Sequence, residues 1–466
     1  MCGHSGNAGE LARSVFRILL VSLLVGTRGY AQSEMWKTRA PMPTPRCCGA
    51  AAAIGGALYA VGGGNSQISP TFYLSVLEAY DPLTDTWSVK APMPTPRTGF
   101  GVSALNGELY VVGGGNFAIP YLASVEAYDP QTDSWTSKAP MPTPRSLLAV
   151  AVADGKLYAI GGSGEAGLLR IVEAYDPQTN TWSEKTPMPA PRRGFAATAL
   201  SGIIYVVGGD DSSTPPDGRP RMVYAYDPQM DTWTTRASIP TGRDGLTAAA
   251  VGGTLYAIGG QNQFGYLATV EAYDPVADSW STEPPMPTAR NALASGALED
   301  TIYAVGGVNF DPSTRATVFL AVNEAFSPFL MVGIDIKPGE ARNTINLKSG
   351  GVVQVAILGS ATFDPLTVDP ETVTLAGASV ATGGRGLPMT SARDANHDGY
   401  PDLVLFFRTQ DLQLTPGSTE AVLYGTTFSG QRLRGAESVR IVPPAKPISA
   451  PGRSRAALAR RAGGLR

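Results

Sequence analysis

Tryptophan recurs along this chain at nearly constant spacing, and this period constrains the fold more than any other feature. The intervals between successive tryptophans are 51, 48, 47, 51 and 47 residues in a chain of 466. The six tryptophans of the sequence are Trp36, Trp87, Trp135, Trp182, Trp233 and Trp280. A motif that rides on such a period indicates small supersecondary units that are stable only when they are stacked on one another.

Each unit carries the same succession of motifs, which predicts four short strands. The second unit runs from a Pro-Met-Pro-Thr-Pro-Arg linker (92–97) through Leu-Tyr-Val-Val-Gly-Gly (109–114) and Glu-Ala-Tyr-Asp-Pro (126–130) to Trp135. Short apolar runs bounded by Gly, Pro and Asp are typical of strands, and the Asp-Pro pieces are typical of tight turns. Four such strands form one antiparallel blade, and blades around an axis form a propeller.

The two ends of the repeat region set the number of blades. Trp36 precedes the first complete unit, whereas the last unit begins at Arg290, reaches Phe326 and has no tryptophan. We therefore expect the strand around Trp36 to complete the last blade, which would leave no exposed sheet edge. The sequence predicts an all-β fold with a six-bladed propeller closed by its N-terminal strand.

The paired glycines, the Tyr-Asp-Pro motif and one tryptophan per repeat resemble the kelch-repeat family over about residues 32–330. The resemblance implies a β-propeller domain, which in this family serves to bind proteins, to bind or convert sugars, or in a few members as another enzyme. Because one fold hosts many unrelated functions, the resemblance leaves the function open.

Residues 1–31 are predicted to be a secretory signal peptide. Arg13 and Arg17 precede an apolar run at 18–26, and the small residues Gly29 and Ala31 suit a cleavage site. The apolar run is shorter than the roughly 20 residues that span a bilayer, and no later segment is long enough. We expect a secreted or cell-surface protein with no transmembrane segment in the mature chain; an uncleaved anchor is the alternative.

Charge is distributed unevenly along the chain. The total of −3 includes +2 in residues 1–31 and +6 in residues 443–466, so residues 32–442 carry −11. An acidic body argues against nucleic acid as a partner. The last 24 residues hold six bases and no acid, which predicts a basic, disordered tail; attachment to an anionic surface is the alternative.

The repeat ends near residue 330, and residues 331–442 are expected to form a second domain. Short strand patterns continue there, at 352–358, 403–407 and 421–424, without tryptophan or blade motifs. Several short strands at regular spacing favour a small β-sandwich-like domain. This region resembles a C-terminal β module of bacterial secreted proteins.

One motif in this second domain predicts a structural calcium site. Oxygen donors at positions 1, 3 and 5, glycine at position 6 and a carbonyl at position 7 are what calcium requires in a loop. The expected ligands are Asp394, Asn396, Asp398, the Tyr400 carbonyl and Asp402. Leu405 replaces the glutamate of a helical calcium hand, so the loop is of the type found between strands. A metal-free Asx turn is the alternative.

Side chains that recur in every repeat are expected to serve the fold, and those that differ are available for a ligand. By this test the Trp, Gly-Gly and Tyr-Asp-Pro positions are structural. Six recurring arginines are expected to be structural as well: Arg46, Arg97, Arg145, Arg192, Arg243 and Arg290. Their expected partners are the recurring glutamates Glu78, Glu126, Glu173, Glu271 and Glu324. An anion site built from this ring of arginines is the alternative.

The loops after Gly-Gly differ among the repeats and carry the candidate ligand-binding residues. Repeats 1, 2, 5 and 6 combine asparagine with aromatic residues, a composition that suits sugar rings and peptide hot spots. The candidates are Asn65, Tyr73, Asn116, Phe117, Tyr121, Asn262, Phe264, Tyr266, Asn309 and Phe310. The alternative is that asparagine caps turns and the aromatic residues pack the loops.

The residue after each recurring arginine is expected near the mouth of the central channel. This set varies: Cys47, Thr98, Ser146, Arg193, Asp244 and Asn291. Arg193 and Asp244 come from neighbouring blades and are expected to pair. Cys47 is followed by Cys48, and the pair allows either a vicinal disulfide or two buried thiols.

Histidine is too rare for several enzyme classes. The two histidines, His4 and His397, lie outside the propeller, which excludes a copper-radical oxidase of the kelch type, a histidine-dependent hydrolase and a Cys/His zinc site. A carboxylate-and-arginine mechanism stays open, as in the kelch enzymes that interconvert sialic acid anomers, with Asp244, Arg193, Glu165 and Asp210 as candidates.

The function that these features favour is that of an exported, non-catalytic protein that uses its propeller loops to bind a glycan or an extracellular protein. A sugar mutarotase or epimerase is one alternative, and a purely architectural surface protein is the other.

Overall fold

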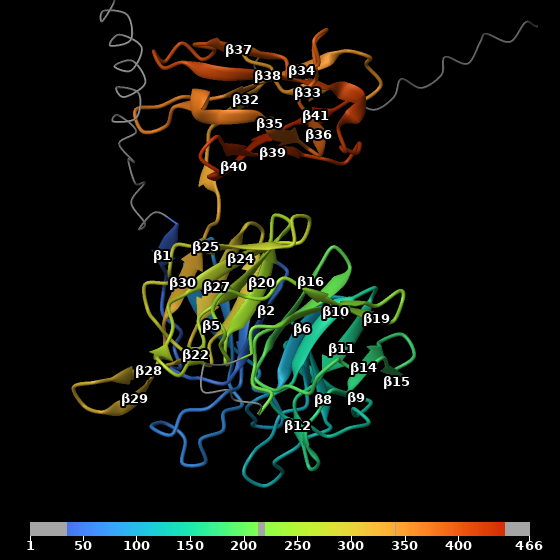
Figure 1. Ribbon diagram of the computed structural model, residues 1–466, viewed down its shortest axis with the longest axis vertical. Coiled ribbons are helices and arrows are strands. Elements are labelled where there is room, and N and C mark those ends of the chain that lie inside the picture. Colours follow the sequence, from blue (N-terminus) through green and yellow to red (C-terminus); the bar gives the residue numbers. More distant parts are fainter. Residues whose placement is uncertain (1–34, 213–219, 341, 443–466) are drawn as a thin grey trace, which may run out of the picture. The chain divides into compact units, whose positions relative to one another are not determined.

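The computed structural model describes residues 35–212, 220–340 and 342–442; the predicted signal peptide and basic tail lie outside them. The chain divides into two compact units between Pro328 and Phe329. Apart from two 3-10 turns, every regular element of the described residues is a β-strand (Figure 1). Accordingly, no helix in this part of the chain is long and apolar enough to cross a membrane. The predicted all-β fold is confirmed.

The described residues of the first unit contain six four-stranded antiparallel sheets, numbered here in chain order. Sheet 1 consists of β2 (Ala50–Ile54), β3 (Ala57–Val61), β4 (Leu77–Asp81) and β5 (Thr86–Lys90). Sheet 2 consists of β6 (Gly101–Leu105), β7 (Glu108–Val112), β8 (Val125–Asp129) and β9 (Ser134–Lys138). Sheet 3 consists of β10 (Ala149–Ala153), β11 (Lys156–Ile160), β14 (Val172–Asp176) and β15 (Thr181–Lys185).

The next two sheets repeat this order. Sheet 4 consists of β16 (Ala196–Leu200), β17 (Ile203–Val207), β18 (Val223–Asp227) and β19 (Thr232–Arg236). Sheet 5 consists of β20 (Thr247–Val251), β21 (Thr254–Ile258), β24 (Val270–Asp274) and β25 (Ser279–Glu283). Small two-stranded ribbons extend from three loops: β12 (Ser163–Gly164) with β13 (Gly167–Leu168), β22 (Gln261–Asn262) with β23 (Gly265–Tyr266), and β28 (Val308–Asp311) with β29 (Ala316–Phe319).

Sheet 6 joins the two ends of the repeat region. Its strands are β26 (Ala294–Leu298), β27 (Thr301–Val305), β30 (Asn323–Phe326) and, at the outer edge, β1 (Trp36–Thr38). Trp36 lies opposite Phe326 in the β1–β30 register, and the two ring centroids are 4.9 Å apart. The tryptophan missing from the last repeat is thus supplied by the first strand of the described chain.

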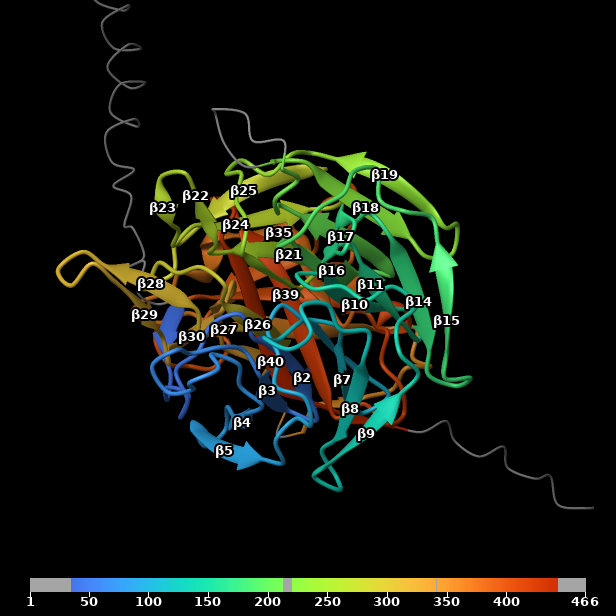
Figure 2. The same ribbon diagram turned by 90° about the horizontal axis from the view of Figure 1, so that it is seen from below.

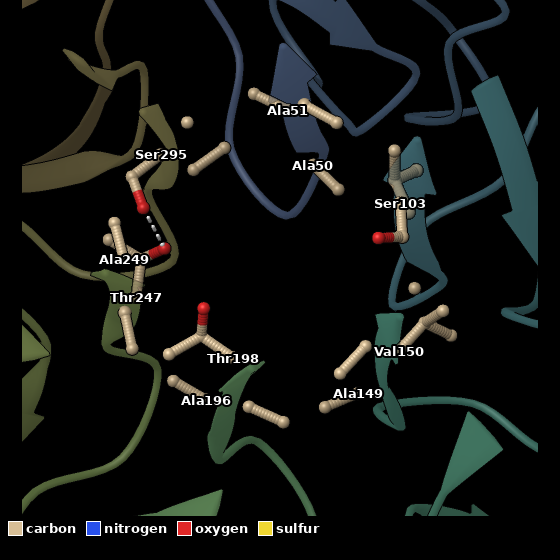
Figure 3. A pocket seen from close by; sticks show the side chains of 18 of the residues that line it. Ala50, Ala51, Ser103, Ala149, Val150, Ala196, Thr198, Thr247, Ala249 and Ser295 are labelled. Carbon is tan, nitrogen blue, oxygen red and sulfur yellow. Dashed lines mark hydrogen bonds between the residues drawn. The ribbon is translucent and has the colours of Figure 1, made fainter. Parts of the chain in front are cut away.

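The first strand of every sheet faces one shared pocket, and this explains its composition. These strands contact one another in succession, from β2 through β6, β10, β16 and β20 to β26, and β26 contacts β2 (Figure 2). They line a pocket of about 410 Å³ whose side chains are mostly Ala, Val, Ser and Thr (Figure 3). The packing allows little more: a Cβ on Gly101 of β6 would lie 2.3 Å from the Val150 side chain of β10. Small residues therefore let six strands converge.

The Trp, Tyr and Asp motifs bind each sheet to the linker that follows the sheet before it. Trp280 Nε1 donates to the Ala237 carbonyl at 2.8 Å, and Asp278 Oδ1 accepts from the Ala237 amide at 2.9 Å and from the Tyr273 hydroxyl at 2.6 Å. The indole bond recurs in all six sheets: Trp87 to Ala40, Trp135 to Ala91, Trp182 to Ala139, Trp233 to Thr186, Trp280 to Ala237 and Trp36 to Pro284. These bonds confirm the structural role predicted for the tryptophans and for the tyrosine of the Tyr-Asp-Pro motif, and they add a structural aspartate two residues before the tryptophan.

The second unit contains a five-stranded and a four-stranded sheet that share one hydrophobic core. The five-stranded sheet consists of β31 (Leu330–Met331), β40 (Arg432–Ser438), β39 (Glu420–Thr427), β35 (Val368–Leu375) and β36 (Ala378–Ser379). The four-stranded sheet consists of β32 (Ile334–Ile336), β34 (Val352–Ile357), β38 (Asp402–Arg408) and β37 (Thr390–Arg393). The remaining elements are β33 (Thr344–Ile345) with β41 (Arg440–Ile441), and the 3-10 turns η1 (Pro365–Thr367) and η2 (Thr409–Asp411).

Candidate functional site

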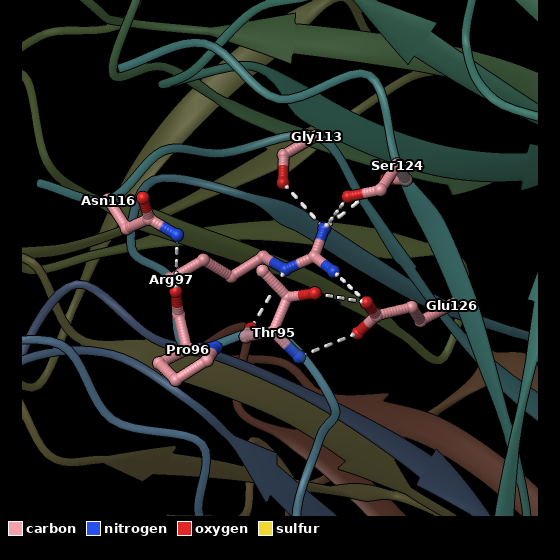
Figure 4. A network of polar contacts seen from close by, with 7 residues as sticks. All are labelled: Thr95, Pro96, Arg97, Gly113, Asn116, Ser124 and Glu126. Atoms are coloured by element: carbon pink, nitrogen blue, oxygen red, sulfur yellow. Dashed lines mark hydrogen bonds and ion pairs between the residues drawn. The ribbon is translucent and has the colours of Figure 1, made fainter. Parts of the chain in front are cut away.

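All six recurring arginines are buried rather than exposed as an anion site, and five of them form ion pairs within their own sheets. In sheet 2, Arg97 lies 2.7 Å from Glu126, donates to the Gly113 carbonyl and to Ser124 Oγ, and is fully buried, while Thr95 Oγ1 donates to Glu126 (Figure 4). The same pairing joins Arg46 to Glu78, Arg145 to Glu173, Arg243 to Glu271 and Arg290 to Glu324. The predicted glutamate partners are confirmed for five of the six arginines.

Sheet 4 departs from this pattern. Tyr224 occupies the position of the glutamate, and the Arg192 guanidinium lies over its ring, 4.6 Å from the centroid. Arg192 Nη1 donates to the carbonyls of Gly208 and Met222 at 3.1 and 2.8 Å, and the side chain is fully buried. Burial lowers the pKa of Arg192, and in place of a paired carboxylate it has these carbonyls and an aromatic face.

A circuit of backbone hydrogen bonds surrounds the start of the six first strands. It involves the second residue after each recurring arginine, and each of these residues donates its N–H to the carbonyl of the next: Cys48 to Ala292, Ala292 to Gly245, Gly245 to Gly194, Gly194 to Leu147, Leu147 to Gly99 and Gly99 to Cys48. All six have left-handed φ values between 52° and 62°. We refer to this set as the mouth circuit.

The mouth circuit could hardly be predicted from residue types. Left-handed φ is the natural conformation of glycine, yet only three of the six positions are glycine, and Cys48, Leu147 and Ala292 adopt it as well. A non-glycine residue in this region costs about 1–3 kcal/mol and persists only where the surrounding structure imposes it. Here the bonds to both neighbouring sheets impose it, and they exist only in the assembled fold.

Beside the mouth circuit lies a pocket of about 460 Å³, the mouth pocket. It is lined by Leu147, Arg193, Gly194, Asp210, Asp244, Gly245, Gln261, Asn291 and Ala292. Arg193 donates through Nε and Nη2 to Asp210 Oδ2 at 3.1 and 3.0 Å. Arg193 was predicted to pair with Asp244, and this prediction is wrong, because its partner is Asp210. A backbone bridge within sheet 4 places Asp210 directly opposite Arg193.

The variable loops begin next to this mouth. The residue after each recurring arginine forms a bridge with the residue after the Gly-Gly pair of its own sheet: Cys47 with Gly64, Thr98 with Gly115, Ser146 with Ser163, Arg193 with Asp210, Asp244 with Gln261 and Asn291 with Val308. Consequently the loops predicted to bind a ligand and the mouth pocket belong to the same end of the sheets. Glu165, by contrast, is exposed in the turn between β12 and β13 and is not part of the pocket lining.

The four candidate asparagines hold their own loops. Asn65 is almost fully buried, donates to the Pro45 carbonyl and accepts from the Gln67 amide. Asn116 makes the same kind of bond to Pro96, and its oxygen accepts from two amides of its loop. Asn262 accepts from the Phe264 amide and Asn309 from the Phe310 amide. These contacts are those of turn-capping residues.

The candidate aromatic residues divide by exposure. Phe117 and Phe264 are 89% and 87% exposed, and Phe310 is also exposed. Tyr73, Tyr121 and Tyr266 are half-buried. Sheets 5, 6, 1 and 2, which carry all of these side chains, are in contact through their first strands in that order. The chain thus presents two strongly exposed phenylalanines on loops of the end that holds the mouth pocket.

The Asp-rich loop of the second unit is organised by backbone amides. Asp402 is fully buried, and its two oxygens accept from the amides of Gly359 and Ala395 at 2.8 and 2.7 Å. Asp394 accepts from the amides of residues 398 and 399, and Asp398 accepts from Tyr400, which lowers the pKa of Asp398.

This arrangement fits calcium only in part. Asp394, Asn396 and Asp398 are hard oxygen donors on an exposed turn, as calcium requires, whereas both Asp402 oxygens are already used by amides. Over residues 35–212, 220–340 and 342–442, no group of three or more His, Cys, Asp and Glu side chains is arranged to hold a metal ion.

Comparison with known proteins identifies the repeats. Residues 50–236 match the KLHDC2/KLHL20/DRC7 kelch-repeats domain, and residues 242–287 match the kelch motif. The human Kelch repeat and BTB domain-containing protein 12 is 34% identical over 88 residues, 18% of this chain and 14% of that protein. The mouse Influenza virus NS1A-binding protein homolog is 45% identical over 80 residues, 17% of this chain and 12% of that protein. The matched segments therefore span only a small part of these relatives.

The fold has a counterpart among solved structures. The structure of YjhT superposes with a TM-score of 0.51 at 18% identity and covers 65% of this chain and 97% of its own. At this identity the likeness concerns the fold alone, which is β-propeller-like.

Proposed function

Given that residues 50–287 of this chain are kelch repeats, we propose that it is an exported, non-catalytic binding protein that recognises an extracellular protein or a glycan with the loops around its mouth pocket. The observation that carries the proposal is the arrangement of this end: the charged Arg193–Asp210 pair lies in a pocket of about 460 Å³, and loops with the exposed Phe117 and Phe264 belong to the same end.

Energetics favour a macromolecular partner over a small ligand. Aromatic side chains supply large contact areas and are enriched at binding hot spots. Phe117 and Phe264 stand on loops of different sheets, 2 and 5, so one partner that buries both must be broad. A protein surface satisfies this most simply, and kelch repeats commonly mediate protein binding. A glycan chain that stacks on one phenylalanine is the second form of the same proposal.

The proposal includes closure of the first unit as a six-bladed propeller. It is supported by the pairing of β1 with β30, by the succession of contacts from β2 to β26 and back, and by the mouth circuit. Closure makes the loop-bearing end a rigid platform, which lowers the entropy cost of binding. Deletion of residues 32–38 would remove the outer strand of sheet 6, and we expect the truncated chain to aggregate through that exposed edge.

Export and calcium complete the proposal. Export rests on the predicted signal peptide at 1–31, and N-terminal sequencing of protein recovered outside the cell tests it. Asp394, Asn396, Asp398 and the Tyr400 carbonyl would hold calcium, whose role would be to stiffen the loop. Calorimetric titration of the full chain with calcium should show saturable binding that Asp394→Asn together with Asp398→Asn abolishes.

The binding proposal is tested with the full chain immobilised and exposed in parallel to a glycan array and to the extracellular proteins of its source. The test variant is Phe117→Ser with Phe264→Ser. The matched control is Leu83→Ser with Val276→Ser, since these two side chains are even more exposed but belong to turns at the opposite end of sheets 1 and 5. Retention that survives in the test variant, or that is lost equally in the control, contradicts the proposed site.

A sugar mutarotase is the second candidate, favoured by the presence of Arg193, Asp210 and Asp244 in one pocket. It predicts that the chain accelerates anomer exchange of a sialic acid in one-dimensional NMR and that Asp244→Asn removes the effect. Exchange at the rate of buffer rejects this candidate for that sugar. If the glycan array, the capture of extracellular proteins and the NMR measurement all detect no binding or activity, a purely architectural role remains.

A further inference from the structure

Two adjacent cysteines meet at the mouth circuit. The Sγ atoms of Cys47 and Cys48 are 2.7 Å apart, within hydrogen-bonding contact, and neither cysteine is in a disulfide. No bond joins the two sulfurs in this structure. Consecutive side chains in an extended strand point to opposite faces. The thiols meet here because Cys48 has the left-handed φ of the mouth circuit, 59°.

The two thiols differ in access and in acidity. Cys47 is 5% exposed, and Cys48 is half-buried as a residue. The S–H···S contact with Cys48, together with burial, raises the pKa of Cys47, and the same contact lowers the pKa of Cys48. Cys48 is thus the member of the pair that forms a thiolate more readily, and the Cys47 thiol lies in contact with it. This is the order of an attacking and a resolving cysteine.

The peptide group between them carries two hydrogen bonds that join separate parts of the fold. The Cys48 N–H donates to the Ala292 carbonyl at 3.0 Å, which links sheet 1 to sheet 6, and the Cys47 carbonyl accepts from the Gly64 amide at 2.8 Å, which holds the first variable loop. A covalent link between the sulfurs would close a ring of eight atoms that contains this peptide group. Such a small ring restricts the peptide, so both hydrogen bonds depend on the state of the thiols.

We propose that Cys47 and Cys48 form a redox modification site that a low-molecular-weight disulfide, such as oxidised glutathione, converts to a vicinal disulfide. The Cys48 thiolate attacks one sulfur of the oxidant and expels one thiolate, which leaves a mixed disulfide on Cys48. Cys47 then loses its proton and attacks Cys48 Sγ, and the second thiolate leaves. The protein loses two electrons and two protons, and one molecule of the oxidant is reduced to two thiols.

Oxidation at this site changes the mouth. Because the strained peptide group no longer holds its two partners in the same geometry, the hydrogen bonds to Ala292 and Gly64 weaken. Oxidation therefore loosens two parts of this end of the first unit. One is the contact between sheets 1 and 6, and the other is the loop that begins at Gly64. The site rests on the positions of the thiols and is independent of the binding proposal.

The experiment treats the reduced full chain with oxidised glutathione, alkylates the remaining thiols and maps the tryptic peptides by mass spectrometry. Cys2 lies on a different tryptic peptide from Cys47 and Cys48, so its modification is measured separately. The expected result is a peptide with both cysteines that is lighter by two hydrogen atoms and carries neither alkyl groups nor glutathione. Full alkylation of both cysteines, or glutathione retained on the wild-type peptide, overturns the proposal.

Two single variants test the order of attack. Cys47→Ser should accumulate glutathione on Cys48, because no resolving thiol is present. Cys48→Ser should leave Cys47 unmodified over the same time, with reactivity toward iodoacetamide roughly tenfold or more below that of Cys48 in the first variant. Equal reactivity of the two cysteines contradicts the order.

Hydrogen exchange of the wild-type chain tests the structural consequence without any variant. The amides of Cys48 and Gly64 should exchange faster after oxidation, whereas the Gly194 amide, in the same circuit between sheets 4 and 3, should keep its rate. Unchanged exchange at Cys48 and Gly64 in a fully oxidised sample shows that oxidation leaves the mouth intact and overturns this part of the proposal.

Discussion

Sheets 4 and 5 place an arginine at the same point of the repeat but satisfy it differently. Arg243 of sheet 5 pairs with Glu271 and donates to the carbonyls of Thr241 and Ala257. Arg192 of sheet 4 faces the ring of Tyr224 and donates to two other carbonyls. Both side chains are fully buried. Backbone carbonyls and an aromatic face are therefore sufficient to keep the arginine in place, and the glutamate is not needed for the position itself.

The two sheets should differ in the stability that is lost when the arginine or its partner is removed. A buried ion pair contributes little net stability relative to an apolar pair, but the loss of one member leaves an uncompensated charge. In sheet 5, removal of either Arg243 or Glu271 leaves the other charge buried, whereas sheet 4 has Tyr224 at the position of the glutamate, so no buried carboxylate of this pair is left when Arg192 is removed. Four experiments test this comparison and a second difference between sheets, Asp278 in sheet 5 against Asn180 in sheet 3. They are given from the largest expected effect to the smallest.

Removal of the carboxylate from sheet 5 should have the largest effect. Glu271→Ala leaves the Arg243 guanidinium buried without its counter-charge, and we expect a loss of about 3–5 kcal/mol in the free energy of unfolding. Urea unfolding followed by tryptophan fluorescence measures it. Glu184→Ala, at an exposed position of β15, is the control and should change stability by less than about 0.5 kcal/mol. A loss below about 1 kcal/mol for Glu271→Ala would contradict the comparison.

Removal of the arginine should separate the two sheets. Arg243→Met leaves Glu271 buried and charged, with a cost again of about 3–5 kcal/mol. Arg192→Met leaves only the carbonyls of Gly208 and Met222 without their donor, and we expect about 1–3 kcal/mol. The same urea experiment measures both variants. Equal losses would show that the carboxylate makes no difference.

The attraction between Arg192 and Tyr224 should be measurable but smaller. A double-mutant cycle with Arg192→Met and Tyr224→Leu is expected to give a coupling free energy of about 0.5–2 kcal/mol, the range for a cation over an aromatic ring. The cycle cancels the packing lost with the tyrosine ring. A coupling of zero would mean that the ring merely fills space.

The smallest effect concerns pH. The Ala237 amide and, after it, the Tyr273 hydroxyl lower the pKa of Asp278. Its contribution to stability is therefore complete above the unfolded value of about 3.9 and is lost as the pH falls through the lower folded pKa. Sheet 3 carries Asn180 at this position with both bonds, to Ala139 and Tyr175, preserved.

Asp278→Asn should therefore keep the structure and flatten the dependence of stability on pH below about 4. Urea midpoints of the wild type and the variant between pH 5 and pH 3 measure this. If the two curves run parallel, the carboxylate has the same pKa in the folded and unfolded chains, and the interpretation fails.

Much of the fold could be predicted because each repeat carries the same strand and turn motifs. The tryptophan spacing, the Gly-Gly pairs and the Tyr-Asp-Pro turns recur in the sequence and in the hydrogen bonds, and even the absence of a tryptophan after Phe326 predicted the pairing with the strand of Trp36. A motif that occurs six times at nearly constant spacing can be recognised as a structural repeat rather than a coincidence. The candidate site was less predictable, since it consists of positions where the repeats differ.

Particular residues show where prediction from sequence failed. For Asn65 and Asn116 the sequence left ligand binding and turn capping open, and the structure shows that both side chains cap their own loops. Arg193 pairs with Asp210, seventeen residues away in its own sheet, instead of with Asp244 of the next. A side chain's partner depends on register and on rotamer, and neither is encoded in residue type alone. The missing sixth glutamate, replaced by Tyr224, was visible in the sequence and is the signal that could have identified sheet 4 as different.

The sequence by itself determined the repeated strands, their order and the residues that join one sheet to the next, because local hydrogen bonding and apolar patterning act over a few residues. Only the tertiary structure decided the mouth. The left-handed backbone of Cys48, Leu147 and Ala292, the contact between the two thiols and the composition of the mouth pocket all arise where six distant segments meet. Their geometry is set by residues of other repeats, which are distant in the sequence, so no local pattern could specify it.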